Sequence, residues 1–178
     1  MSKIEVNELA ARSGSNISMT AGHTFQPIFH SQTVFPTGHV LQTLHSESTS
    51  EVSSTSTSYA DTGFNLSITP SSTSSKVFMI FDFTAFTYSN NQSAEIGAAF
   101  KIVRDSTDIK AFEDANGYTL KMERGASNYW EAYRQTLTHL DSPNTTSAVN
   151  YKLHHKRLIG GQFQIRGPSK ITLMEVAG

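Results

Sequence analysis

The histidines and carboxylates of this sequence are spaced unfavourably for a metal centre. His154 and His155 are adjacent, and neighbours on a strand point to opposite faces, so this pair cannot chelate one ion. Two other pairs have the i, i+2 spacing that places both side chains on one face of a strand: His45 with Glu47, and His139 with Asp141. Neither pair has a third ligand nearby, and a catalytic zinc ion needs three. The sequence therefore predicts no metal site.

The acidic residues also give no catalytic arrangement. Four of them lie in or beside turn sequence, where aspartate commonly forms the turn itself: Asp105, Asp108, Glu113 and Asp114. The chain contains no Gly-x-Ser-x-Gly nucleophile motif, no phosphate-binding P-loop and no Gly-x-Gly-x-x-Gly dinucleotide motif. We therefore expect a protein that is not an enzyme and that uses no cofactor.

Two groups of aromatic and amide side chains could instead bind a receptor or a glycan. They lie where a loop meets a strand: Tyr88, Asn90 and Asn91 in one, and Tyr129, Trp130 and Tyr133 in the other. Aromatic rings with an apolar body and a polar edge can stack on sugars at such places. The alternative is that Trp130 only completes the hydrophobic core.

Composition excludes several classes of partner. The formal net charge is −1 and no stretch interleaves basic and aromatic residues, so we expect no nucleic-acid binding. No run approaches the ~20 apolar residues of a spanning helix, which predicts no membrane insertion. The chain has no cysteine, and its first residues lack the apolar region of a signal peptide.

The stretch 63–86 is expected to organise the fold. Phe64, Leu66 and Ile68 alternate with polar residues, which is typical of a half-buried strand. Pro70 and the Ser/Thr run that follows it break this strand. A second strand begins at Lys76, and we expect the two strands to form a hairpin.

The second strand of this stretch is apolar on both faces. One face carries Val77, Met79, Phe81 and Phe83, and the other carries Phe78, Ile80 and Phe86. A strand of this kind must be covered on both sides, so it is central to a sandwich, and its second face is a candidate subunit interface. Asp82 interrupts this second face and is expected to pair with Arg104 or Arg134.

The remaining pattern predicts an all-β protein. Ser and Thr make up about a quarter of the chain, which suits strands and turns better than helices. Further strands are expected over residues 39–45, 94–104, 117–123, 130–140, 149–155, 162–166 and 171–176, with a polar edge strand or a linker over 46–58. Short strands at this spacing predict an antiparallel, jelly-roll-like β-sandwich head over residues 38–178.

Residues 1–37 are expected to form an extended attachment arm and linker. A helix over 5–12 and a small hairpin are both compatible with its sequence. The segment has too few apolar residues to form a hydrophobic core of its own. Its apolar side chains are the candidates for docking on another protein: Ile4, Val6, Leu9, Ile17, Met19, Phe25 and Phe29.

Four short motifs and the N-terminus resemble those of a known group of proteins. The motifs are SITPSSTSSKV (67–77), VRDST (103–107), LDSPNTTSAVNYKL (140–153) and ITLMEVAG (171–178), and the opening is MSKIEVNELAARSGSNISM (1–19). In this order they resemble tail-fibre and receptor-binding modules of tailed bacteriophages, especially marine and cyanobacterial ones. The resemblance implies a homotrimeric β-sandwich head, other virion proteins as partners, a host-surface glycan or protein as receptor, and synthesis in the host cytoplasm followed by assembly into the virion.

Three functional hypotheses follow from these observations. The first is a non-enzymatic virion structural protein, either a short tail fibre or its receptor-binding tip, docked on the particle by residues 1–37. The second is a capsid decoration or head spike protein. The third is a free carbohydrate-binding, lectin-like module.

Overall fold

The computed structural model describes residues 35–89, 95–123, 129–159 and 162–178 of the chain, and these form ten β-strands and no helix. The strands are β1 (Val40–Ser48), β2 (Val52–Ser54), β3 (Ala60–Ile68), β4 (Lys76–Ser89), β5 (Glu95–Arg104), β6 (Thr107–Ala111), β7 (Leu120–Glu123), β8 (Tyr129–Asp141), β9 (Val149–Ile159) and β10 (Gln162–Val176).

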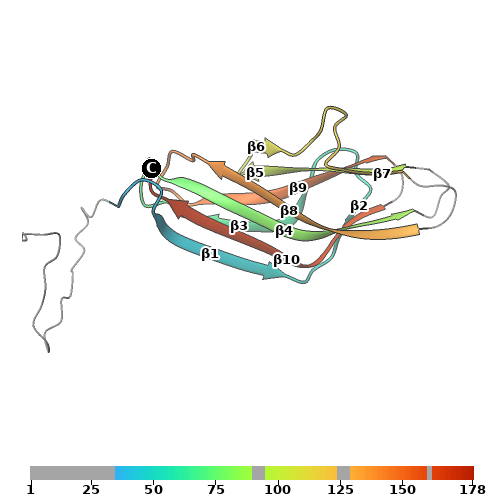
Figure 1. Cartoon of the computed structure of the whole chain (residues 1–178), viewed down its shortest axis with the longest axis horizontal. Coiled ribbons are helices and arrows are strands. Elements are labelled where there is room, and N and C mark those ends of the chain that lie inside the picture. Colours follow the sequence, from blue (N-terminus) through green and yellow to red (C-terminus); the bar gives the residue numbers. More distant parts are fainter. Residues whose placement is uncertain (1–34, 90–94, 124–128, 160–161) are drawn as a thin grey trace, which may run out of the picture. The chain divides into compact units, whose positions relative to one another are not determined.

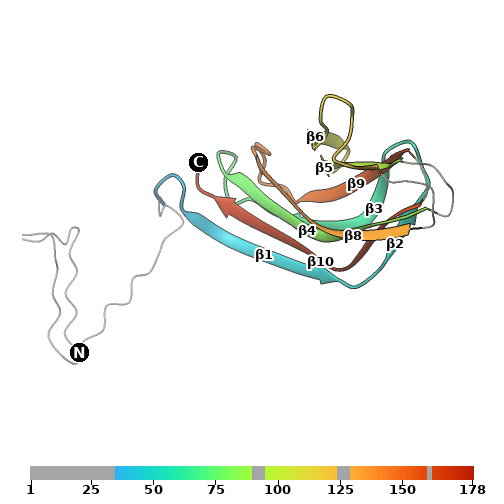
Figure 2. The same ribbon diagram turned by 45° about the vertical axis from the view of Figure 1, so that its right-hand side comes forward.

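The strands form two antiparallel sheets that lie face to face (Figures 1 and 2). The sheet named here the β4 sheet has the order β1-β10-β4-β8, with β2 also paired to β10. The other, the β9 sheet, has the order β3-β9-β5-β6, with β7 also paired to β5. The chain crosses between the sheets at most of its connections, which is the connectivity of a jelly roll. The prediction of an all-β, antiparallel sandwich is confirmed.

The predicted hairpin over residues 63–86 is wrong. β3 pairs with β9, whereas β4 lies between β10 and β8 in the opposite sheet. The Ser/Thr-rich connection after Pro70 therefore crosses from one sheet to the other. The alternation of apolar residues in each strand was interpreted correctly. The face of β3 that carries Phe64 and the face of β4 that carries Phe81 both point into the core. Phe64 and Phe81 meet across that core edge to face, with ring centroids 5.9 Å apart.

β4 supplies the centre of the core, as predicted. Val77, Met79, Phe81 and Phe83 have no exposed surface. Across the sandwich, β5 contributes Phe100, whose ring lies 4.9 Å from that of Phe83. Burial of a large apolar side chain stabilises the fold by about 1.5–3 kcal/mol, so β4 alone is a large contributor.

The two strands predicted over 162–166 and 171–176 are one strand, β10. It pairs with β4 on both sides of an irregularity between Arg166 and Lys170. Pro168 lies inside this irregularity and cannot donate a ladder hydrogen bond. The proline interrupts the pairing locally, but the strand continues beyond it beside the same neighbour.

The first described residues join the sandwich at the end that holds the C-terminus. Gly38 donates a backbone hydrogen bond to Ala177, and Ala177 donates one to His39, both of 2.8 Å. The proposed docking residues of the arm, from Ile4 to Phe29, lie outside the described residues, as do Asn90 and Asn91. The predicted boundary at residue 37 stays a prediction.

Candidate functional site

The outer face of the β4 sheet carries four of the residues selected from the sequence, namely Phe78, Ile80, Phe86 and Tyr88. The alternation of β4 points Phe78, Ile80, Asp82, Phe86 and Tyr88 away from the core, because the residues between them are buried. Along the strand this face changes from apolar to charged and then to a pocket. Each region combines residues of β4 with cross-strand neighbours on β8, on β10 or on both.

The first region is an apolar patch at the C-terminal end of the sandwich. Its members are Val40, Phe78, Ile80, Leu140, Met174 and Val176. Register places Phe78 between Leu140 and Met174, while Val40 is opposite Val176. Leu140 and Val40 are each 47% exposed. Large contiguous apolar patches on the surfaces of monomeric proteins often mark interaction sites.

The second region is a belt of ion pairs in the middle of the face. Arg134 binds Asp82 through two parallel hydrogen bonds, Nε to Oδ1 and Nη2 to Oδ2, each of 2.6 Å. These bonds hold the pKa of Asp82 below its ordinary value. Lys170 pairs with Glu47 at 2.9 Å. Of the two partners expected for Asp82, Arg134 is therefore the right one.

The third region is an open pocket of about 410 Å³ near the end of β4 and the start of β10. It is lined by Phe86, Tyr88, Gln162, Gln164 and Arg166. Gln162 is the register partner of Tyr88, and Gln164 is the partner of Phe86. Polar side chains from one strand thus meet aromatic rings from the next, which suits a ligand with both apolar and hydrogen-bonding surface.

Contacts within the pocket fix its polar groups. The Arg166 guanidinium carbon lies 3.5 Å from the centroid of the Phe86 ring. Arg166 Nε donates to Gln164 Oε1 at 2.9 Å, and Gln164 Nε2 donates to Gln162 Oε1 at 3.5 Å. A guanidinium stacked in this way keeps a defined plane. Phe86, a predicted interface residue, is only 7% exposed because the other pocket groups cover it.

Two of the predicted glycan-contacting residues, Tyr88 and Tyr133, lie on opposite faces of the β4 sheet. Tyr88 is 37% exposed and lines the pocket. β8 runs beside β4 so that Trp130 is the register partner of Tyr88, and Tyr129 that of Ser89. Tyr133 is opposite the fully buried Ala85 and therefore belongs to the inner face, where it is 37% exposed near the sandwich edge. Tyr88 and Tyr133 do not form one site.

Sequence analysis missed Gln162, Gln164 and Arg166. Their i, i+2 spacing predicts that they share a face of a strand, and this alternation was the available signal. Their partner strand was not evident, because β10 meets β4 from a distant part of the sequence.

The adjacent histidines of β9 lie on opposite faces, as strand alternation predicts. His154 and His155 point to opposite sides of β9, and His155 is 1% exposed inside the core. Burial lowers the pKa of His155, so the ring is neutral near pH 7. Within the described ranges, no three histidine or acidic side chains converge as a metal would require. In the same residues, no helix has the length and hydropathy to cross a membrane.

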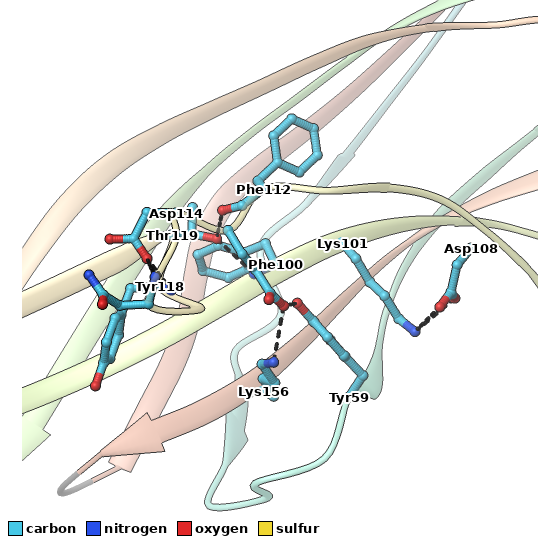
Figure 3. Close-up of polar contacts among 11 residues, drawn as sticks. Tyr59, Phe100, Lys101, Asp108, Phe112, Asp114, Tyr118, Thr119 and Lys156 are labelled. Carbon is cyan, nitrogen blue, oxygen red and sulfur yellow. Dashed lines mark hydrogen bonds and ion pairs between the residues drawn. The ribbon is translucent and has the colours of Figure 1, made fainter.

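A separate polar cluster lies around Tyr59 on the β9 sheet (Figure 3). The Nζ atoms of Lys101 and Lys156 lie 4.5 and 4.6 Å from the centroid of the Tyr59 ring. Asp108 accepts a hydrogen bond from Lys101 at 2.7 Å, and Glu113 pairs with Lys156 at 3.0 Å and accepts the Tyr59 hydroxyl. Each charge has a partner, so this cluster stabilises the connection after β6 and offers no group for a ligand.

The resemblance motifs form several sets of hydrogen bonds at the C-terminal end of the sandwich. Glu175 from the last motif is 1% exposed and accepts hydrogen bonds from Ser71 N at 2.7 Å and Ser71 Oγ at 2.6 Å. Gln42 Nε2 donates a hydrogen bond of 2.7 Å to the other carboxylate oxygen of Glu175, Oε2. The Ser/Thr connection between the sheets is therefore held by the C-terminal strand.

The two internal motifs join the same end. Asp105 and Asn150 exchange hydrogen bonds of 2.8 and 2.9 Å, and Asn150 Nδ2 donates to Ser67 Oγ at 2.8 Å. Arg104 Nη1 lies 2.5 Å from Asp141 Oδ2, which also accepts the hydroxyl of the buried Tyr151 at 2.7 Å. These motifs build the framework of the sandwich, whereas the pocket lies toward the opposite end of the β4 sheet.

Comparisons with known proteins give no family. No family model matches the chain, and no curated protein matches it. The fold is similar to that of the VP2 subviral particle of infectious bursal disease virus, with 13% identity and a TM-score of 0.42 over 77% of this chain. The structure of the Gx strain of that virus has 11% identity and a TM-score of 0.39 over 80%. Dimeric latent PorU from Porphyromonas gingivalis has 10% identity and a TM-score of 0.34 over 76%.

The chain spans only part of each of these proteins. It covers 33% of either viral chain and 13% of the PorU chain. The strand order and register of the described residues themselves define an antiparallel jelly-roll sandwich.

Proposed function

We propose that this protein is a non-enzymatic structural component of a virion. The observation that carries the proposal is the apolar patch on the outer face of the β4 sheet, around Phe78 and Leu140. Leu140 and Val40 of this patch are each 47% exposed, and burying such groups against another surface would stabilise an assembly. Two further copies of this chain are proposed to bury the patch, so that the protein forms a homotrimer.

The finer proposal is a short tail fibre of a tailed bacteriophage or its receptor-binding tip. It is supported by the motifs at 67–77, 103–107, 140–153 and 171–178, which make one structural end of the sandwich. Phe35, the first described residue, precedes the backbone bonds that tie the chain to this same end. Residues 1–37 are the proposed attachment arm, and the pocket of the sandwich is the proposed receptor-binding part.

Two measurements test this proposal. Light scattering of the purified chain at micromolar concentration is expected to give three times the mass of the monomer. Antibodies against the chain, imaged by electron microscopy on purified particles, are expected to label the tail. A monomer in solution, together with particles free of the protein, would contradict a virion role; labelling of the head alone would instead support a capsid decoration protein.

A further inference from the structure

We propose that the pocket lined by Phe86, Tyr88, Gln162, Gln164 and Arg166 binds a carbohydrate that carries a carboxylate group, such as a uronic acid unit. Its role in host attachment rests on the proposed function above, but the binding itself is a property of the single chain and can be tested separately.

The guanidinium of Arg166 is already oriented for binding a carboxylate. Its guanidinium plane is fixed by stacking on Phe86 at 3.5 Å and by the 2.9 Å hydrogen bond from Nε to Gln164. A planar donor fork that is already ordered loses little freedom when it binds a carboxylate through two parallel hydrogen bonds. The guanidinium is the anchor of the proposed site.

The present ionic partner of Arg166 can be displaced. Glu51 Oε1 lies 3.4 Å from Arg166 Nε, and the two side chains are 60% and 38% exposed. Exposed ion pairs of this kind contribute about 0–1 kcal/mol. A ligand carboxylate that approaches from the pocket therefore competes with a weak contact. Among the residues that line the pocket in the described part of the chain, none is acidic.

Two further groups are placed for sugar hydroxyls. In the described part of the chain, neither the Tyr88 hydroxyl nor Gln162 Nε2 has a hydrogen-bond partner, although both residues line the pocket. The Tyr88 ring is 37% exposed and offers an apolar face to a sugar ring. The pocket volume of about 410 Å³ lies within the ~300–1,000 Å³ typical of small-molecule sites.

These features favour an acidic sugar over a purely apolar or a neutral ligand. An apolar ligand would leave the guanidinium, the amide and the hydroxyl desolvated without partners, which is costly. A neutral sugar could use the hydroxyl and the amide but would not use the positive charge. A carboxylated sugar satisfies all three groups at once.

The test uses the full-length protein and uronate tetrasaccharides. Tetramers of galacturonate, mannuronate, guluronate and alternating glucuronate and N-acetylglucosamine are titrated by calorimetry, each beside its methyl ester, which removes the charge. At least one acid is expected to bind, and its ester at least tenfold more weakly. Arg166→Gln is expected to lower the affinity at least tenfold, and Tyr88→Ala to lower it as well.

Lys170→Gln is the matched control. It removes one positive charge from the same strand and the same face, outside the pocket, where Lys170 contacts Glu47. This variant is expected to keep the wild-type affinity, and the melting temperature of each variant checks that it is folded. Absence of binding by all four acids, or equal losses in the Arg166 and Lys170 variants, would overturn the proposed site. Those results leave the particle labelling and the trimer measurement unaffected, so a failure of this inference is distinguishable from a failure of the proposed function.

Discussion

Arg134 and Asp82 form a two-bond ion pair across β8 and β4, and the same arginine reaches a third strand. Besides the two 2.6 Å bonds to Asp82, Arg134 Nη1 donates to the backbone oxygen of Pro168 at 2.9 Å. Pro168 lies in the irregular part of β10, where ladder hydrogen bonds are interrupted. One side chain thus links three neighbouring strands where the pairing of β10 is interrupted.

Asp82→Asn is expected to lower the free energy of unfolding by about 1 kcal/mol at pH 7, because it removes a charge-assisted pair that is partly screened by solvent. The pKa of Asp82 is lowered by Arg134, so the contribution is present above the ordinary value of 3.8 and is lost as the pH falls below it. Urea denaturation from pH 7 to pH 2.5 measures both effects. Asp108→Asn is the control, because this carboxylate is 66% exposed in its pair with Lys101, and it should change stability by less than half as much. Equal changes in the two variants would contradict the linking role of Arg134.

Glu175→Gln is expected to cost about 1–3 kcal/mol, because an amide cannot accept from both Ser71 and Gln42 as the carboxylate does. Burial opposes ionisation of Glu175, but the hydrogen bonds, first those of Ser71, outweigh it and hold its pKa below the usual 4.5. The contribution is therefore present above pH 4.5 and decreases below it. Thermal unfolding at pH 7 and pH 4 checks this. Glu51→Gln, at an exposed side chain, should be neutral, and a neutral Glu175→Gln would show that the motif network does not stabilise the sandwich.

The sequence predicted the faces of strands more reliably than their partners. Alternation identified the inward Phe81 and Phe83 correctly, because a period of two depends only on which side of the strand is buried. It could not distinguish a hairpin from a crossing between sheets, since the Ser/Thr connection after Pro70 has turn chemistry that is compatible with both. Alternation likewise placed Asp82 on the outer face. It did not show which strand lies beside β4, so both Arg104 and Arg134 remained candidates for the ion pair with Asp82.

The pocket could not be predicted because its two halves come from distant segments. Phe86 and Tyr88 belong to β4, whereas Gln162, Gln164 and Arg166 belong to β10, and only the register between these strands brings them together. In the sequence alone, the last three residues read as the solvent face of an ordinary strand. The separation of Tyr133 from Tyr88 has a similar origin, since it depends on the pairing of β8 with β4.

Acidification is expected to destabilise the sandwich through His155. This ring is 1% exposed, its two nitrogens have no hydrogen-bond partner within the described residues, and it packs 5.6 Å from the Phe163 ring. Burial, and then the charge of His154, lower its pKa in the folded state. The unfolded chain therefore binds this proton more readily, and stability is lost as the pH falls below the ordinary value of about 6.5.

The measurement for His155 is urea denaturation at pH 7.5, 6.0 and 5.0. A single group of this kind contributes at most about 1.4 kcal/mol per pH unit below 6.5. His155→Leu keeps an apolar side chain of similar size in the core and is expected to remove most of this slope. An equal slope in the wild type and in His155→Leu would show that other groups cause the acid sensitivity.

Phe78→Asp is expected to dissociate the proposed trimer while leaving the single sandwich folded. Phe78 lies at the centre of the apolar patch, between Leu140 and Met174, and points away from the core. A carboxylate there stays solvated in a monomer but would be buried without a partner in an interface, at a cost of several kcal/mol. The dissociation constant of the trimer should therefore rise by two orders of magnitude or more, as measured by sedimentation equilibrium.

Two control variants give this last prediction its specificity. Thr107→Asp adds the same charge at an exposed position of β6 on the other sheet and should leave the trimer intact. Phe83→Ala, a truncation inside the core, is expected to lower the free energy of unfolding by about 3–5 kcal/mol. If Phe78→Asp and Thr107→Asp both leave the trimer intact, the subunits meet through another surface, because a buried carboxylate in the patch could not be tolerated without a loss of affinity.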